Sequence, residues 1–158
     1  MNLYISDLHF GHKNVIGFDH RPFADVDEMD NYIIRAWNSR VQNDDSVFIV
    51  GDVCYRNEKS EQWYLRQLKG HKILIVGNHD DKLLNNRAAL RYLEGIEQDM
   101  HIKDGNINIY LNHVPVPDWE NTYNEAWHIY GHIHNKKNEV YEKMRENQRA
   151  LNCGCSHE

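Results

Sequence analysis

The segment ILIVGNHD, residues 73–80, joins an apolar run to a polar end, and the same combination recurs along the chain. Residues 72–76 have the length and aliphatic content of a buried β-strand. Gly77 follows this run, and the polar residues NHD come directly after the glycine. In α/β sheets, ligands bind at the carboxyl ends of the strands. The segment therefore predicts a strand that ends in a functional site.

Other apolar runs end in the same way. Residues 2–6 lead to Asp7 and His9, residues 46–50 to Asp52, residues 107–111 to His113, and residues 127–130 to His132 and His134. Strands that are distant in sequence present their carboxyl ends at one edge of a sheet, so these polar residues are expected to share one crevice. Side chains two positions apart in an extended chain point to the same side, so each pair can serve one cluster.

Glycines stand directly before three of these polar residues, at positions 51, 77 and 131. A residue without a side chain lets the backbone turn sharply and approach a ligand closely. We expect the glycines to make room for the site.

Amphipathic stretches alternate with the apolar runs. Apolar residues at spacings of three and four predict a helix over residues 26–41, with Asp25 and Glu28 as its capping pair. Further helices are expected over residues 59–68, stopped at Gly70, and over residues 80–93, ending at Gly95.

The remaining segments predict strands and one excursion. Residues 99–103 and 107–111 form a predicted hairpin turned at Asp104-Gly105, and residues 127–130 and 150–153 form a last strand pair. The charged segment 135–148 is expected to be a solvated hairpin or excursion. The alternation indicates an α/β domain.

Composition sets broader expectations. A chain of 158 residues predicts one compact domain over residues 1–158. A net charge of -6 without a basic run disfavours binding of long nucleic acid. Without a long apolar stretch or a basic leader at Met1, we expect neither a membrane span nor a secretion signal, and hence a cytoplasmic protein. Eleven histidines direct attention to metal ligands.

The polar blocks follow one another in a defined order, which is Asp7-x-His9, Gly51-Asp52, Gly77-Asn78-His79-Asp80, His113 and Gly131-His132-Ile133-His134. In order and spacing they resemble the calcineurin-like metallophosphoesterase superfamily, in its small bacterial or phage-type forms. The resemblance spans residues 7 to 134. It implies a four-layer α-β-β-α sandwich, in which two packed sheets are flanked by helices.

The resemblance also implies roles for individual residues. One metal would be held by Asp7, His9 and His134, the other by Asn78, His113 and His132, with Asp52 bridging the two. His79 would be the catalytic histidine, and Asp80 its orienting neighbour. Mixed oxygen and nitrogen ligands suit Mn, Fe or Zn.

The charge of such a centre suits a phosphate ester. Two divalent ions, two carboxylates and a bridging hydroxide leave a net charge of about +1, which attracts an anion. Paired ions activate a shared water that attacks phosphorus. The sequence thus predicts a metal-dependent hydrolase of phosphodiester or phosphomonoester bonds that acts on a small phosphorylated substrate.

Two further residues are candidate substrate contacts. His12 lies just past the first predicted ligands, where an exposed loop histidine is the alternative. Arg56 lies four residues after Asp52, where the protein Ser/Thr phosphatase branch carries a phosphate-binding arginine. The match is partial, because Tyr55 and Asn57 replace that branch's Asp and Gly.

Two other functions remain as alternatives. One is a non-catalytic metal-binding interaction scaffold, like the retromer subunit of this superfamily, which lacks the catalytic histidine that His79 matches here. The other is a nuclease, which the charge of -6 and the lack of an added DNA-binding domain disfavour. Because the chain ends soon after residues 151–154, the edge of the second sheet is expected to be short or completed by a partner, and a homo-oligomer is compatible with this.

Overall fold

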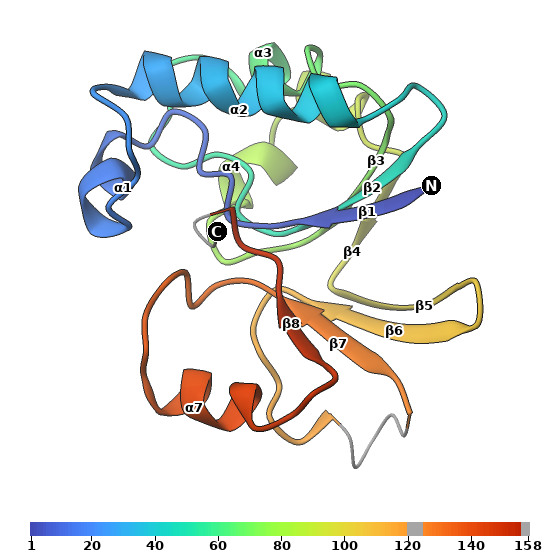
Figure 1. The fold of residues 1–158 in the computed structure, drawn as a ribbon. Helices are drawn as coiled ribbons and strands as arrows, with labels where there is room; N and C mark the ends of the chain where they lie inside the picture. The colour runs from blue at the N-terminus through green and yellow to red at the C-terminus, as the bar shows by residue number, and fades with distance from the viewer. Residues whose placement is uncertain (120–124, 156–158) are drawn as a thin grey trace.

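The computed structural model of the protein describes residues 1–119 and 125–155, which form two four-stranded sheets (Figure 1). The first sheet is parallel, with the order β1 (Asn2–Ile5), β2 (Ser46–Val50), β3 (His71–Ile75) and β4 (Gly95–Glu97). The second has the order β5 (Asp99–Asp104), β6 (Ile107–Asn112), β7 (Trp127–Tyr130) and β8 (Ala150–Asn152). In the second sheet β5 and β6 are antiparallel and the other pairs are parallel.

The helices lie outside the two sheets. They are α1 (Lys13–Phe18), α2 (Val26–Arg40), α3 (Glu61–Leu65), α4 (Asp81–Leu84), α5 (Arg87–Leu90) and α7 (Glu139–Arg145). In Figure 1 the long helix α2 runs along the outer side of the first sheet, and α7 lies beyond the second sheet.

Strand β2 shows why the layers form. Val47 and Ile49 belong to the apolar cluster that includes Trp37 of α2. The alternate residues Phe48 and Val50 pack instead with residues of β6 and β7. A strand buried on both faces reads as a continuous apolar run, as this one does. With a third cluster between the second sheet and Met144 of α7, the four-layer α-β-β-α sandwich is confirmed.

The predicted helix over residues 26–41 is confirmed as α2. The Asp25 carboxylate accepts a hydrogen bond from the Glu28 backbone N–H at 2.8 Å, and Glu28 Oε2 accepts one from the Ala24 N–H at 2.7 Å. Such side-chain bonds satisfy backbone N–H groups that have no partner within the helix.

The prediction of one continuous helix over residues 80–93 was wrong, because the chain forms the two short helices α4 and α5 there. Asn86 lies between them, and its side chain accepts a hydrogen bond from the Ala89 N–H at 3.2 Å, so a second helix starts there. The helix expected over residues 59–68 is shorter, as α3 covers Glu61–Leu65. Gly95 begins β4, a strand that the sequence did not predict.

The charged segment 135–148 contains helix α7, so the expected solvated excursion was wrong. Asn138 caps this helix by accepting a hydrogen bond from the Tyr141 N–H at 2.9 Å. Met144 is buried against the second sheet, and Val140 and Tyr141 of the same helix are partly buried against it, so a few apolar side chains anchor a helix whose other residues are charged.

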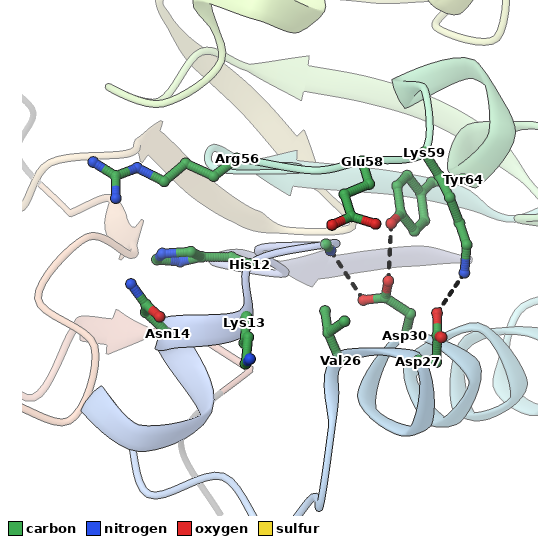
Figure 2. Close-up of a pocket in the computed structure, with 11 residues that line it drawn as sticks. His12, Lys13, Asn14, Val26, Asp27, Asp30, Arg56, Glu58, Lys59 and Tyr64 are labelled. Carbon is green, nitrogen blue, oxygen red and sulfur yellow. Dashed lines mark hydrogen bonds and ion pairs between the residues drawn. The ribbon is translucent and has the colours of Figure 1, made fainter.

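The loop that follows β1 is held from α2 and α3 (Figure 2). Asp30 of α2 accepts hydrogen bonds from the Gly11 N–H at 3.1 Å and from the Tyr64 hydroxyl of α3 at 2.9 Å. Lys59 and Asp27 form an ion pair at 2.6 Å beside these bonds. The position of the Gly11–His12 turn is therefore fixed by the helix layer.

The C-terminal residues connect the two sheets. Strand β8 is a short edge strand, and the chain beyond it pairs with the end of β1: the Ser6 N–H donates to the Cys153 carbonyl and the Cys155 N–H to the Ser6 carbonyl, each at 3.0 Å. Within residues 1–119 and 125–155, no helix has the length and apolar character needed to cross a membrane.

Candidate metal centre

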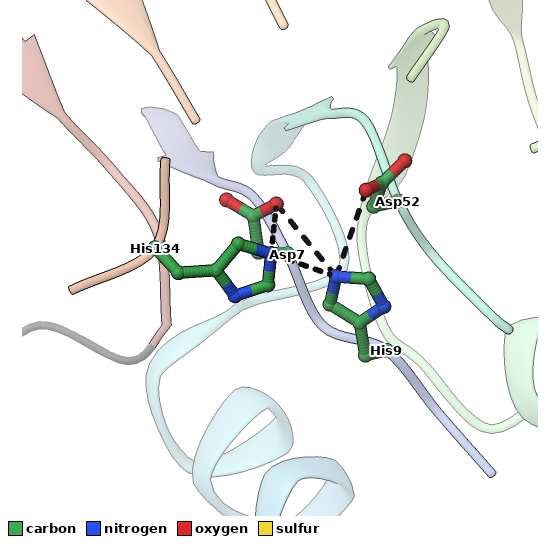
Figure 3. A group of neighbouring side chains, drawn as sticks. All are labelled: Asp7, His9, Asp52 and His134. Atoms are coloured by element: carbon green, nitrogen blue, oxygen red, sulfur yellow. Dashed lines mark hydrogen bonds and ion pairs between the residues drawn. The ribbon is translucent and has the colours of Figure 1, made fainter. Parts of the chain in front are cut away.

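One group of donor atoms gathers at the ends of β1, β2 and β7 (Figure 3). Asp7, His9, Asp52 and His134 offer ligand atoms that all lie within 4.8 Å of one another. The His9 and His134 Nε2 atoms are 3.2 Å apart. Asp7 Oδ1 is 3.6 Å from His134 Nε2, and Asp52 Oδ2 is 3.6 Å from His9 Nε2. Four donors thus surround one position.

A second group adjoins the first. Asn78 Oδ1 lies 3.1 Å from His113 Nε2 and 2.8 Å from His132 Nδ1. Asp52 Oδ2 lies 3.4 Å from His113 Nε2, and this is the oxygen that also faces His9. One carboxylate oxygen therefore lies between the two groups, and the structure brings together all the residues that the sequence predicted as ligands.

The backbone at this site is strained. Several candidate ligands have left-handed φ angles, namely Asp7 at 55°, His9 at 51°, Asp52 at 58°, His132 at 69° and His134 at 52°. For a residue with a side chain, this conformation costs about 1–2 kcal/mol. Residues held in sparsely populated conformations cluster at functional sites.

The predicted role of the glycines is confirmed. A side-chain carbon added at Gly131 would collide with the Ser6 hydroxyl and with Asp7 Oδ2. One added at Gly77 would collide with the Asp52 carboxylate, and one at Gly51 with the His113 ring. The glycines leave the space that the acidic and imidazole side chains occupy.

Hydrogen bonds behind the site orient its histidines. His134 Nδ1 is 2.7 Å from Asp19 Oδ2, and His113 Nδ1 is 2.7 Å from the Val50 carbonyl oxygen. Each bond holds a proton on Nδ1, so Nε2 is the nitrogen of each ring that faces the other candidate ligands. Metal-binding histidines are commonly held in this way by a carboxylate or a carbonyl.

Asp19 and its neighbour Arg21 are site residues that the sequence analysis missed. Asp19 is buried beside His134, and the Arg21 guanidinium donates to the carbonyl oxygens of Asp7 at 2.7 Å and Leu8 at 2.9 Å. Both residues lie in the segment between α1 and α2, and the apolar residues that precede Asp19, residues 15–18, belong to helix α1 and not to a strand. The local sequence carries no signal that could have identified them.

Burial and neighbouring charges shift the pKa values of several candidate ligands, in different directions. Burial raises the pKa of Asp52, but the hydrogen bond and charge of His113 outweigh burial and lower this pKa to about 2. Burial alone lowers the pKa of His113, but Asp52 raises it to about 9. Burial lowers the pKa of His9 to about 3, so its ring is neutral.

The donor set fits divalent metal ions. Buried carboxylates are stabilised by a nearby cation, and neutral imidazoles are common ligands of Mn, Fe and Zn. Asp7 and Asp52 are both almost fully buried, and the nitrogen atoms of His9 and His134 face the same point. The residues present therefore suit a metal in the first group, and the shared Asp52 oxygen suits a second.

His79 lies beside the first group, whereas Asp80 lies behind it. The His79 N–H donates to Asp52 Oδ1 at 2.9 Å, and its ring centroid is 3.9 Å from that of Tyr55 and 5.7 Å from that of His9. The Asp80 carboxylate accepts hydrogen bonds from the backbone N–H groups of Gly77, Asp52 and Val53 at 2.8, 2.9 and 2.9 Å. The Asp80 carboxylate therefore connects the loop that carries Asp52 with the loop that carries Asn78.

His12 and Arg56 lie to one side of the donor groups. The His12 ring centroid is 5.6 Å from that of His9 and 4.8 Å from that of Tyr55. The ring is buried, with an exposed fraction of 7%, so the alternative of an exposed loop histidine was wrong. The Arg56 guanidinium lies over the Tyr55 ring at 5.3 Å. Both residues line a cavity of about 230 Å³.

The amino-acid sequence was compared with those of known protein families and proteins. No family model matches the chain. The chain is 30% identical to the uncharacterised protein MJ1445 of Methanocaldococcus jannaschii over 150 residues, which cover 94% of this chain and 77% of that protein.

Solved structures share the fold. The AQ665 protein of unknown function from Aquifex aeolicus matches with a TM-score of 0.77 and 25% identity, covering 99% of this chain and 90% of that one. An archaeal phosphodiesterase matches with a TM-score of 0.56 and 16% identity, covering 97% and 81%. The chain therefore belongs to the family of the Methanocaldococcus jannaschii protein, and its fold is that of the calcineurin-like metallophosphoesterases.

Proposed function

We propose that this protein is a metal-dependent phosphoesterase that hydrolyses a phosphodiester or phosphomonoester bond in a small substrate, using two divalent ions. The observation that carries the proposal is the position of Asp52. Its Oδ2 atom lies 3.6 Å from His9 Nε2 and 3.4 Å from His113 Nε2, so one oxygen can serve two ions.

Each ion would have its own set of ligands in addition to Asp52. Asp7, His9 and His134 would hold one, and Asn78, His113 and His132 the other. Mn, Fe and Zn all suit these oxygen and nitrogen donors. When bound, a pair of such ions supplies an activated hydroxide for attack on phosphorus and offsets the negative charge of the phosphate.

The side chains around the ions would complete the reaction. The His79 ring is the candidate donor of a proton to the leaving oxygen, because it lies beside the first donor group and histidine is the most common general acid in enzymes. The His79 backbone N–H donates a hydrogen bond to Asp52 Oδ1, which keeps the backbone of residue 79 next to the shared carboxylate. Asp80 would hold the loop that carries Asp52 next to the loop that carries Asn78. His12 and Arg56 would contact the substrate.

Metal analysis followed by an activity assay tests this function. The protein loaded with Mn²⁺ is assayed on bis(p-nitrophenyl) phosphate and on p-nitrophenyl phosphate, which differ only in being a diester and a monoester. We expect hydrolysis of at least one, abolished by a chelator and restored by Mn²⁺. Asp52→Asn should lose more than about 100-fold in kcat/KM, whereas Asp44→Asn, on the exposed surface, should match the wild type.

The same assay distinguishes the alternative of a metal-binding scaffold. If two ions are bound and neither ester is hydrolysed, the phosphoesterase proposal fails and the scaffold alternative is favoured. The position of the His79 ring beside the first donor group supports the enzyme, because a scaffold does not require a proton donor there.

A further inference from the structure

The cavity of about 230 Å³ beside the candidate metal centre has two ends of different character (Figure 2). At one end Lys59 forms an ion pair with Asp27, and Asp30 accepts two hydrogen bonds. The Glu58 carboxylate lines the cavity as well. At the other end Figure 2 shows the side chains of His12, Asn14 and Arg56 directed to the same side, away from the Lys59–Asp27 pair. All three residues line the cavity.

Among the described residues, the second end has a cation without an ion-pair partner and a buried imidazole nitrogen without a hydrogen-bond partner. Arg56 is exposed, contacts the Tyr55 ring and forms no ion pair within the described ranges 1–119 and 125–155. His12 Nδ1 is buried and has no hydrogen-bond partner in the same part of the chain. Leaving a buried polar atom unpaired costs about 1–3 kcal/mol. A ligand that accepts hydrogen bonds would remove this cost.

This end adjoins the metal centre without being part of it. The His12 ring is 5.6 Å from the His9 ring, and Tyr55, which carries Arg56 over its face, is 3.9 Å from the His79 ring, centroid to centroid. None of the candidate metal ligands lines the cavity. A phosphate bound by Arg56 would therefore be a different one from the phosphate that reacts.

We propose that His12, Asn14 and Arg56 form a subsite for a second phosphate group, carried by the leaving group of the substrate. A guanidinium binds two phosphate oxygens at once, and the Asn14 amide and the imidazole N–H each add a donor. This inference rests on the proposed function and narrows its substrate to a phosphodiester whose leaving alcohol bears a phosphate monoester, as at the phosphorylated end of a short nucleotide.

The reaction at such a substrate balances as a simple hydrolysis. The oxygen of water bonds to the phosphorus of the diester, and the bond from phosphorus to the leaving oxygen breaks. The leaving oxygen keeps the electron pair and takes a proton, so that an alcohol is released. The second phosphate is unchanged and serves only for binding.

Three dinucleotides test the subsite: dTpdT, pdTpdT with a 5′-terminal phosphate, and dTpdTp with a 3′-terminal phosphate. With the Mn²⁺-loaded protein, one phosphorylated form should exceed dTpdT by at least about 10-fold in kcat/KM, because a charge-assisted contact contributes about that much to affinity. Arg56→Gln and Asn14→Ala should reduce this ratio toward one. The matched control Arg35→Gln, at an exposed position of α2, should keep the ratio.

A binding measurement separates failure of the subsite from failure of the enzyme. Calorimetric titration with thymidine 5′-phosphate and with thymidine should show phosphate-dependent binding that Arg56→Gln weakens at least about 10-fold and Arg35→Gln does not. If no dinucleotide is hydrolysed but this binding is seen, the subsite stands and the proposed hydrolysis fails. If Arg56→Gln keeps both the substrate ratio and the affinity of the wild type, the subsite is overturned.

Discussion

Asp19 Oδ2 lies 2.7 Å from His134 Nδ1, and this hydrogen bond joins residues 115 positions apart in the chain. The other ring nitrogen of His134 faces Asp7 and His9. The carboxylate thus fixes both the tautomer and the direction of a candidate ligand.

Asp19→Asn is expected to weaken Mn²⁺ binding at the first donor group at least about 10-fold, because an amide holds the imidazole less strongly than a carboxylate does. Calorimetric titration of wild type and variant with Mn²⁺ measures the change. The exposed variant Asp44→Asn removes the same charge far from this contact and should bind like the wild type. Wild-type affinity in Asp19→Asn would remove Asp19 from the metal centre.

Gly131→Ala should disrupt the site, whereas Gly17→Ala should not. A methyl group at Gly131 would collide with the Ser6 hydroxyl and Asp7 Oδ2, while one at Gly17, in α1, meets no atom within 4 Å. Overpacking costs about 1–3 kcal/mol and here would displace a candidate ligand. Urea unfolding and Mn²⁺ titration of both variants check this. Equal behaviour of the two would show that the backbone at residue 131 has room to relax.

His79→Ala is expected to keep both metal ions and to lose at least about 100-fold in kcat, because general acid catalysis contributes 10²- to 10⁴-fold. The His79 backbone N–H still holds Asp52 in this variant, so the ligands should stay in place. Metal content and the hydrolysis rate of the same preparation are measured together. A variant with full metal and unchanged kcat would exclude the imidazole from the reaction.

Much of the fold is encoded locally. The apolar runs at β1, β2, β3 and β7 identify strands, and the polar residues that follow them identify the site, because both signals lie within a few residues. Asp19 has no such signal, since its role arises only when His134 folds back onto it. No local pattern records a contact of that kind.

The incorrect helix predictions have similar causes. The break between α4 and α5 depends on the Asn86 side chain, which competes with a continuing helix by capping the next one. Helix α7 is mostly charged, and the burial of Met144 depends on the second sheet beneath it. The sequence shows a polar segment there, and tertiary packing makes it a helix.

The stability of the fold should fall in acid because of His128. This ring is fully buried, with Nδ1 3.2 Å from the Tyr110 carbonyl oxygen and Nε2 accepting from the Val116 N–H at 3.1 Å, and burial lowers its pKa from 6.5 to about 4. In the unfolded chain His128 binds a proton below about pH 6.5, whereas in the folded chain it binds one only below about pH 4. The free energy of unfolding is therefore unaffected by His128 above pH 6.5 and decreases as the pH falls below this value.

The free energy of unfolding should be about 3 kcal/mol lower at pH 4 than at pH 7, because each unit of difference in pKa corresponds to about 1.4 kcal/mol. Urea unfolding of metal-free wild type and His128→Leu at pH 7, 5 and 4 measures it. The variant has a different absolute stability, but its decline between pH 6.5 and 4 should be smaller by that amount. Identical slopes in the two proteins would show that His128 does not resist protonation.

In the proposed phosphoesterase, one oxygen of Asp52 serves two metal ions. Anomalous X-ray diffraction from crystals of the Mn²⁺-loaded protein tests it most directly. We expect two manganese peaks, one among Asp7, His9 and His134 and one among Asn78, His113 and His132, with Asp52 Oδ2 in contact with both. A single peak, or two peaks that share no Asp52 oxygen, would contradict it.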